Sequence, residues 1–137
     1  MTTNEEVAEI LKNIDKHIKY IEKKNITNIK QLKNDQDLYL AVSMSIFTLI
    51  NSLLELGDEI IKNDKLSIPK RYKDIAYSLY ENSIINENQQ EIFIKLIKIR
   101  NNIAHEYETK VKYEDILYSI QNLNFIKEMI KISINKL

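Results

Sequence analysis

LAVSMSIFTLINSLLEL, residues 40–56, is the most apolar stretch of the chain and decides its fold. Apolar side chains recur in it at helical spacing and cover most of its circumference, so we expect a helix at the centre of the domain. Asp35 is placed to cap this helix. Ser, Thr and Asn interrupt the stretch, which is also short for a membrane span. The positions that define the helix are Leu38, Val42, Ile46, Leu49, Leu53, Leu56 and Ile60.

Four further helical segments are predicted around this one. Gly57, within the central helix, either allows another element to approach closely or costs about 1 kcal/mol relative to Ala. Residues 25–35 form a polar connection with room for one helical turn. Pro69 suits the first position of the third helix, with Tyr72 and Tyr80 on its inner face. The five segments run from Asn4 to Ile21, from Leu38 to Ile60, from Pro69 to Ile85, from about Asn88 to about His105, and from about Tyr113 to the C-terminus.

The composition favours helices over sheets. The chain of 137 residues has one Gly and one Pro, and 44% of its residues are hydrophobic. So few helix breakers in a chain of this length predict helices joined by short connections. We therefore expect one all-α domain over residues 1–137, an up-and-down bundle of four long helices plus a shorter one.

Charge and residue usage exclude several classes of function. Acidic and basic residues balance, so the whole chain does not attract nucleic acid, although a local basic patch such as PKRYK (69–73) remains possible. The absence of Cys excludes disulfides, thiolate nucleophiles and zinc–cysteine sites. Two histidines, His17 and His105, are too few to suggest a transition-metal site. The N-terminus has no signal-peptide pattern, so we expect a cytoplasmic protein with no membrane contact.

The stretch IRNNIAHEY, residues 99–107, ends the fourth predicted helix with an unusual set of polar groups. On a helical wheel Arg100 falls inside the apolar stripe formed by Phe93, Leu96, Ile99 and Ile103, with Tyr107 almost directly below it. A buried guanidinium is costly unless it pairs with a carboxylate, reaches solvent, or lines a cleft that receives an anion. Asp58 or Glu59 is a possible carboxylate partner.

Asn101 and His105 lie four residues apart on a neighbouring face that Ile94 and Ile97 flank. We interpret this second apolar strip as a partner surface, most simply for a second copy of the chain. Arg100 and His105 point about 140° apart on an ideal helix. They converge on one atom only if the helix turns after Ala104, or if two copies surround a shared cleft.

The pattern R-x4-H-x-Y, present as Arg100, His105 and Tyr107 with Asn101 directly after the arginine, resembles the signature of the HEPN superfamily. It resembles most closely the HepT toxins of HepT/MntA toxin–antitoxin systems. The order of elements in residues 56–107 also resembles this family, and residues 38–137 match its layout.

This resemblance implies a metal-independent endoribonuclease that acts as a homodimer without a cofactor of its own. Arg100 would bind the scissile phosphate, His105 would act as general acid or base, and Asn101 would orient the histidine or the phosphate. Tyr107 matches the residue that an MntA-type nucleotidyltransferase antitoxin modifies with AMP from ATP. The suggested RNA substrate in the family is tRNA, although nothing in these residues selects it.

Other interpretations remain open from the residues alone. Arg100 would then be a structural ion-pair residue, His105 a favourable charge at a helix C-terminus, and Tyr107 an aromatic at the edge of the core. Within the resemblance, a non-catalytic module that binds nucleotide or substrate beside a nucleotidyltransferase is the main alternative. A helical adaptor whose polar motif forms only an interface network is the other.

Overall fold

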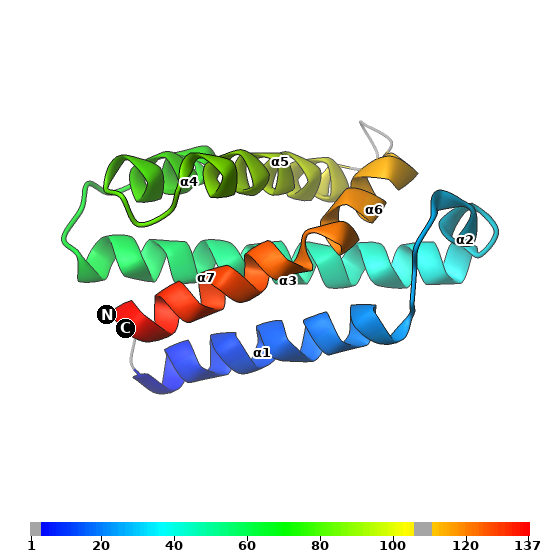
Figure 1. Cartoon of the computed structure of the whole chain (residues 1–137), viewed down its shortest axis with the longest axis horizontal. Helices are drawn as coiled ribbons and strands as arrows, with labels where there is room; N and C mark the ends of the chain where they lie inside the picture. Colours follow the sequence, from blue (N-terminus) through cyan, green and yellow to red (C-terminus); the bar gives the residue numbers. More distant parts are fainter. Residues whose placement is uncertain (1–3, 106–110) are drawn as a thin grey trace.

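The computed structural model describes residues 4–105 and 111–137, and this part of the chain is helical throughout apart from short connections. The four long helices are α1 (Asn4–Lys23), α3 (Gln36–Asn63), α5 (Glu87–Ala104) and α7 (Leu123–Lys136). They alternate in direction along the bundle, with α3 between α1 on one side and α5 on the other (Figure 1). The prediction of an all-α, up-and-down bundle is confirmed.

Polar side chains set three of the helix starts, and one of them, Asp35, was predicted as a cap. The Asp35 carboxylate accepts a hydrogen bond from the backbone N–H of Leu38 at 3.0 Å, which caps α3. Asn28 caps the short helix α2 (Ile29–Lys33), which lies in the connection where one turn was predicted. Asn86 caps α5.

Helix α3 forms the core of the bundle. By length and composition it could cross a membrane, but 61% of its most apolar window is buried inside the protein, as expected for a central helix. The stretch 40–56 lies within a helix of 28 residues, so length alone does not exclude a membrane span, and burial explains the apolar character of the helix. The fully buried side chains on α3 include Val42, Ile46, Leu49, Ile50, Leu53, Leu56 and Ile60.

Gly57 allows a close approach between helices, the first of the two predicted explanations. A Cβ atom added at Gly57 would lie 2.6 Å from Cγ2 of Ile75 on α4 (Tyr72–Glu81). Helix α4 therefore packs against α3 at a distance that only glycine permits.

Helix α4 is shorter than predicted at both ends. It begins at Tyr72 and not at Pro69, because the Asp74 carboxylate accepts a hydrogen bond from the backbone N–H of Arg71 at 3.0 Å and starts the helix there. It ends before Ser83, whose φ of 60° is in the left-handed region and stops the helix. The assignment of Tyr72 and Tyr80 to the inner face was also wrong, because both are more than a third exposed.

The last predicted helix is two helices, α6 (Tyr113–Gln121) and α7, separated at Asn122. The side-chain amide of Asn122 donates a hydrogen bond to the carbonyl oxygen of Tyr118 at 2.8 Å and so replaces a backbone donor at the break. After the break α7 runs on across α3 (Figure 1). The ring centroid of Phe125 on α7 lies 5.7 Å from that of Phe93 on α5.

Candidate functional site around Arg100

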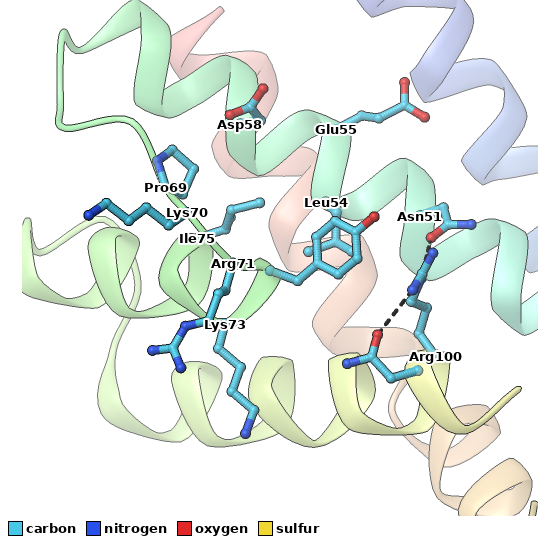
Figure 2. A pocket seen from close by; sticks show the side chains of 12 residues that line it. Asn51, Leu54, Glu55, Asp58, Pro69, Lys70, Arg71, Lys73, Ile75 and Arg100 are labelled. Carbon is cyan, nitrogen blue, oxygen red and sulfur yellow. Dashed lines mark hydrogen bonds between the residues drawn. The ribbon is translucent and has the colours of Figure 1, made fainter. Parts of the chain in front are cut away.

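Arg100 lies on α5, four residues before its end, and its side chain is half-buried between α5 and α3. Its Nε donates a hydrogen bond of 2.7 Å to Oδ1 of Asn51 on α3, and its Nη1 donates one of 3.0 Å to Oδ1 of Asn101 (Figure 2). Both acceptors are neutral amide oxygens. The guanidinium is therefore fixed in place without any loss of its positive charge.

Two aromatic rings complete the surroundings of the guanidinium. Its central carbon lies 5.0 Å from the ring centroid of Phe47 on α3 and 4.7 Å from that of Tyr72, the first residue of α4. Contacts of this kind stabilise a cation by roughly 0.5–2 kcal/mol without neutralising it. Arg100 is thus held by groups from three helices.

Within residues 4–105 and 111–137, no carboxylate lies within ion-pair distance of Arg100. The suggested partners were Asp58 and Glu59. Their carboxylate oxygens instead lie 3.0 Å (Asp58 Oδ2) and 3.6 Å (Glu59 Oε1) from the Nζ atom of Lys62. The suggestion that either of them neutralises Arg100 was therefore wrong. Of the predicted options for a buried guanidinium, a cleft that receives an anion fits these contacts best.

Such a cleft lies beside Arg100. It has a volume of about 1000 Å³, and we call it the Arg100 pocket. Asn51 and Arg100 lie at one end, and the charged ends of Lys70, Arg71 and Lys73 point away from them (Figure 2). Arg100 is therefore the cation inside the pocket, and the other three lie at its rim. The lining residues are Asn51, Leu54, Glu55, Asp58, Pro69, Lys70, Arg71, Tyr72, Lys73, Ile75, Arg100 and Asn101.

The structure brings Arg100 and Asn101 together, but His105 does not line the Arg100 pocket. His105 is the exposed C-terminal cap of α5, and its backbone N–H donates to the carbonyl oxygen of Asn101 at 3.1 Å. Helix α5 ends at Ala104, the residue after which the helix would have to turn for Arg100 and His105 of one chain to converge. Tyr107 lies outside the described residues.

The interpretation of Ile94 and Ile97 as a partner surface was wrong for Ile97. Its side chain is fully buried in the core of its own chain, and Ile94 is half-buried. The face of α5 next to Asn101 is therefore largely occupied by the bundle itself. Helix α5 packs against α3, α4 and α6, so neighbouring helices of the same chain surround it on several sides.

Three contacts of Arg100 were not predicted from the sequence: Asn51, Phe47 and Tyr72. Asn51 carried a usable signal, since it is a polar residue in the most apolar helix of the chain. An amide that is removed from water needs a hydrogen-bond partner, so the half-buried Asn51 indicates a polar group on a neighbouring helix. That partner is Arg100.

The second histidine, His17, lies at the edge of the core as expected. Its Nδ1 lies 2.7 Å from the hydroxyl oxygen of Ser45, and burial, followed by the nearby charge of Lys16, lowers its pKa from the ordinary value. In the described part of the chain, no three His, Asp or Glu side chains are grouped so that they could hold a metal ion.

Comparisons with known proteins bear on this arrangement. A toxin–antitoxin crystallised with AMP-PNP superposes with a TM-score of 0.82 at 19% identity, covering 96% of this chain and 99% of that chain. The tri-AMPylated Shewanella oneidensis HEPN toxin, solved in complex with MNT antitoxin, gives a TM-score of 0.83 at 20% identity. The match covers 95% of this chain and 97% of that chain. YutE from Bacillus subtilis, described as a cytosolic protein of unknown function, gives a TM-score of 0.80 at 17% identity. The match covers 96% of this chain and 87% of that chain.

At these identities the three structures establish a shared fold. No curated protein sequence matches the chain significantly. The family model described as ribonuclease HepT-like, in contrast, matches residues 6–132, nearly the whole chain. The resemblance inferred from the Arg100 motif is thereby confirmed, and the chain belongs to the HepT-like ribonuclease family.

Proposed function

We propose that this protein is a metal-independent endoribonuclease that acts as the toxin of a toxin–antitoxin pair. Its membership of the HepT-like ribonuclease family supports the reaction class. Two proteins of the same fold are a HEPN toxin bound to an MNT antitoxin and a toxin–antitoxin with AMP-PNP, which supports the biological role. The observation that carries the proposal is a guanidinium at the end of a pocket, held within residues 4–105 and 111–137 by neutral acceptors and aromatic rings alone.

In the proposed reaction the Arg100 guanidinium binds the scissile phosphate of an RNA strand, with tRNA as the proposed substrate. Guanidinium donors match the geometry of phosphate oxygens, and the attraction grows as negative charge develops during the reaction. The ribose 2′-oxygen attacks the phosphorus and the bond to the 5′-oxygen breaks. The products are a 2′,3′-cyclic phosphate end and a 5′-hydroxyl end.

His105 would move the protons of this reaction. A neutral imidazole takes the proton of the 2′-hydroxyl, and an imidazolium gives a proton to the leaving 5′-oxygen. His105 lies outside the Arg100 pocket of its own chain. We therefore propose that the protein acts as a homodimer, in which two copies of His105 and Arg100 surround one cleft.

A face of α3 supports the proposed homodimer. Leu40, Met44, Phe47 and Asn51 follow one another at spacings of four, three and four residues, so they lie on one side of the helix. Leu40 and Met44 are 46% and 59% exposed, whereas Phe47 and Asn51 reach Arg100. This exposed apolar face is thus continuous with the site, where a second copy would complete the cleft.

The proposed control of the toxin is the addition of AMP to Tyr107 by a cognate nucleotidyltransferase of the MntA type, with ATP as the donor. The AMP group would bring a phosphate close to the motif that Arg100 begins, and this phosphate would compete with RNA for the cation. The chain itself would need no cofactor. A cytoplasmic location accords with an RNA substrate and with the cytosolic description of YutE.

The test is cleavage of purified RNA in the presence of EDTA by the wild type, His105→Ala and His17→Ala. His17 is the chain's only other histidine, which makes it a matched control. We expect fragments with cyclic phosphate ends from the wild type and His17→Ala, and a loss of about 100-fold or more in His105→Ala. Nucleotide binding without cleavage by the wild type would favour the non-catalytic alternative.

A further inference from the structure

We propose that Asn51 is a positioning residue for Arg100, and that its neutrality matters as much as its hydrogen bond. The Asn51 carbonyl oxygen would fix the direction of the guanidinium while leaving its full positive charge available to an RNA phosphate. This inference rests on the proposed ribonuclease function. It assigns a role in the site to a residue on the central helix, 49 positions away from Arg100 in the sequence.

The geometry of the guanidinium supports this assignment. An arginine side chain carries five N–H donors. One at Nε is used by Asn51 at 2.7 Å, and one at Nη1 is used by Asn101 at 3.0 Å. Among the described residues no acceptor is bonded to Nη2. Three donors therefore remain for a ligand, and the two amides determine in which direction they point.

The position of Asn51 in the bundle makes it suitable for this task. It lies in the middle of α3, the helix that forms the core, and its neighbours Ile50 and Ser52 are buried. Asn101, in contrast, lies on α5 beside Arg100 itself, three residues before the helix ends. Of the two amides, Asn51 is thus the one that ties the guanidinium to the central helix of the bundle.

The choice of an amide has an electrostatic consequence. A carboxylate at position 51 would accept the same hydrogen bond and hold Arg100 more strongly. It would also place a negative charge at hydrogen-bond distance and offset the cation that must attract RNA. The carboxylates that share the Arg100 pocket, Glu55 and Asp58, have no ion pair with Arg100, and Asp58 pairs with Lys62.

A purely structural role for Asn51 makes the opposite prediction. If the amide served only to satisfy a half-buried arginine, then Asn51→Asp would satisfy it at least as well and would keep full activity. If the amide preserves the charge of Arg100, then Asn51→Asp would fold at least as stably as the wild type and would lose RNA affinity. Stability and activity therefore change in opposite directions only under our proposal.

The experiment compares Asn51→Asp and Asn51→Ala with Asn13→Ala as a control. The Asn13 amide donates to the hydroxyl of Ser52 at 3.2 Å, so it also joins a helix to α3, but it does not line the Arg100 pocket. Each variant is measured for thermal unfolding, for binding of a 2′-O-methyl RNA that cannot be cleaved, and for single-turnover cleavage of unmodified RNA.

We expect Asn51→Asp to unfold at or above the wild-type temperature, to bind the RNA at least about tenfold more weakly and to cleave at least about 100-fold more slowly. Asn51→Ala should lose less binding than Asn51→Asp, because it loses orientation but keeps the charge. Asn13→Ala should bind and cleave within about threefold of the wild type. Binding and cleavage by Asn51→Asp within twofold of the wild type would overturn the proposal.

The outcomes separate this proposal from the proposed function. If the wild type binds RNA without cleaving it, the ribonuclease assignment fails, and the binding measurements on the two Asn51 variants still decide the role of Asn51. If Asn51→Asp does not fold, Asn51→Ala decides, and unchanged RNA binding and cleavage in that variant would overturn the proposal. A wild type that binds no RNA overturns both.

Discussion

The central carbon of the Arg100 guanidinium lies 4.7 Å from the centroid of the Tyr72 ring. Tyr72 is the first residue of α4 and Arg100 lies near the end of α5, so this contact joins a helix start to the candidate site. Asp74 fixes that start by its hydrogen bond to the backbone of Arg71. The way in which the chain enters α4 therefore helps to determine where the Arg100 guanidinium lies.

We predict that Tyr72→Phe keeps RNA cleavage within about threefold of the wild type, whereas Tyr72→Ala reduces it about tenfold. Phenylalanine retains the ring against the guanidinium, and alanine removes it and leaves Arg100 freer to move. Single-turnover cleavage kinetics measure both. Equal rates in the Ala variant and the wild type would show that the ring does not position Arg100.

We predict that Met44→Glu converts the protein from a dimer into a folded monomer that no longer cleaves RNA. A charge on the exposed apolar face of α3 would have to be buried without a partner in the proposed dimer. Sedimentation velocity gives the oligomeric state. Ile134→Glu is the control, because Ile134 is equally exposed, at 61%, but lies on α7. A monomeric wild type, or a dimeric and active Met44→Glu, would contradict the proposed dimer.

We predict that Gly57→Ala lowers the free energy of unfolding by up to about 2 kcal/mol. The added methyl would overlap the Ile75 side chain, which typically costs about 1–3 kcal/mol and exceeds the gain of about 1 kcal/mol in helix propensity. Urea unfolding measures the change. Adding Ile75→Leu removes the γ2 methyl that clashes and should restore part of the loss. A Gly57→Ala variant more stable than the wild type would contradict the close packing of α3 and α4.

We predict that stability falls as the pH is lowered below about 6.5, and that His17→Gln weakens this dependence. Burial lowers the pKa of His17 in the folded protein, so the unfolded chain binds more protons in this range. The contribution of neutral His17 is therefore complete above pH 6.5 and is lost as the pH falls toward the lowered pKa. Thermal unfolding between pH 7.5 and 5 measures it. If the stability of His17→Gln depended on pH as steeply as that of the wild type, His17 would not be the source of this dependence.

Much of the fold could be predicted because its determinants are local. The periodic apolar residues of α1, α3 and α5 and the cap at Asp35 follow from spacing and hydrogen bonding along one helix. The break at Asn122 and the late start of α4 could not be predicted in this way. Each depends on one side chain that forms a hydrogen bond with a backbone group, Asn122 with the carbonyl of Tyr118 and Asp74 with the N–H of Arg71. The burial of Ile97 depends on a neighbouring helix.

The candidate site was predicted in part. The motif identified Arg100 and Asn101, and the structure joins them by a hydrogen bond. The partners from other helices, Asn51, Phe47 and Tyr72, were not identified, because contacts between residues so far apart in the sequence have no periodic signal. The position of His105 outside the pocket likewise depends on where α5 ends, and its role and that of Tyr107 stay predictions.

The most direct test of the account uses the two arginines of the chain. Arg71 lies at the rim of the same pocket but is paired with Asp74, which makes Arg71→Ala a matched control for Arg100→Ala. In single-turnover cleavage of RNA with EDTA present, we expect Arg100→Ala to be slower than the wild type by about 100-fold or more, and Arg71→Ala by less than about tenfold. Cleavage by Arg100→Ala at the wild-type rate, or no cleavage by the wild type, would contradict the account.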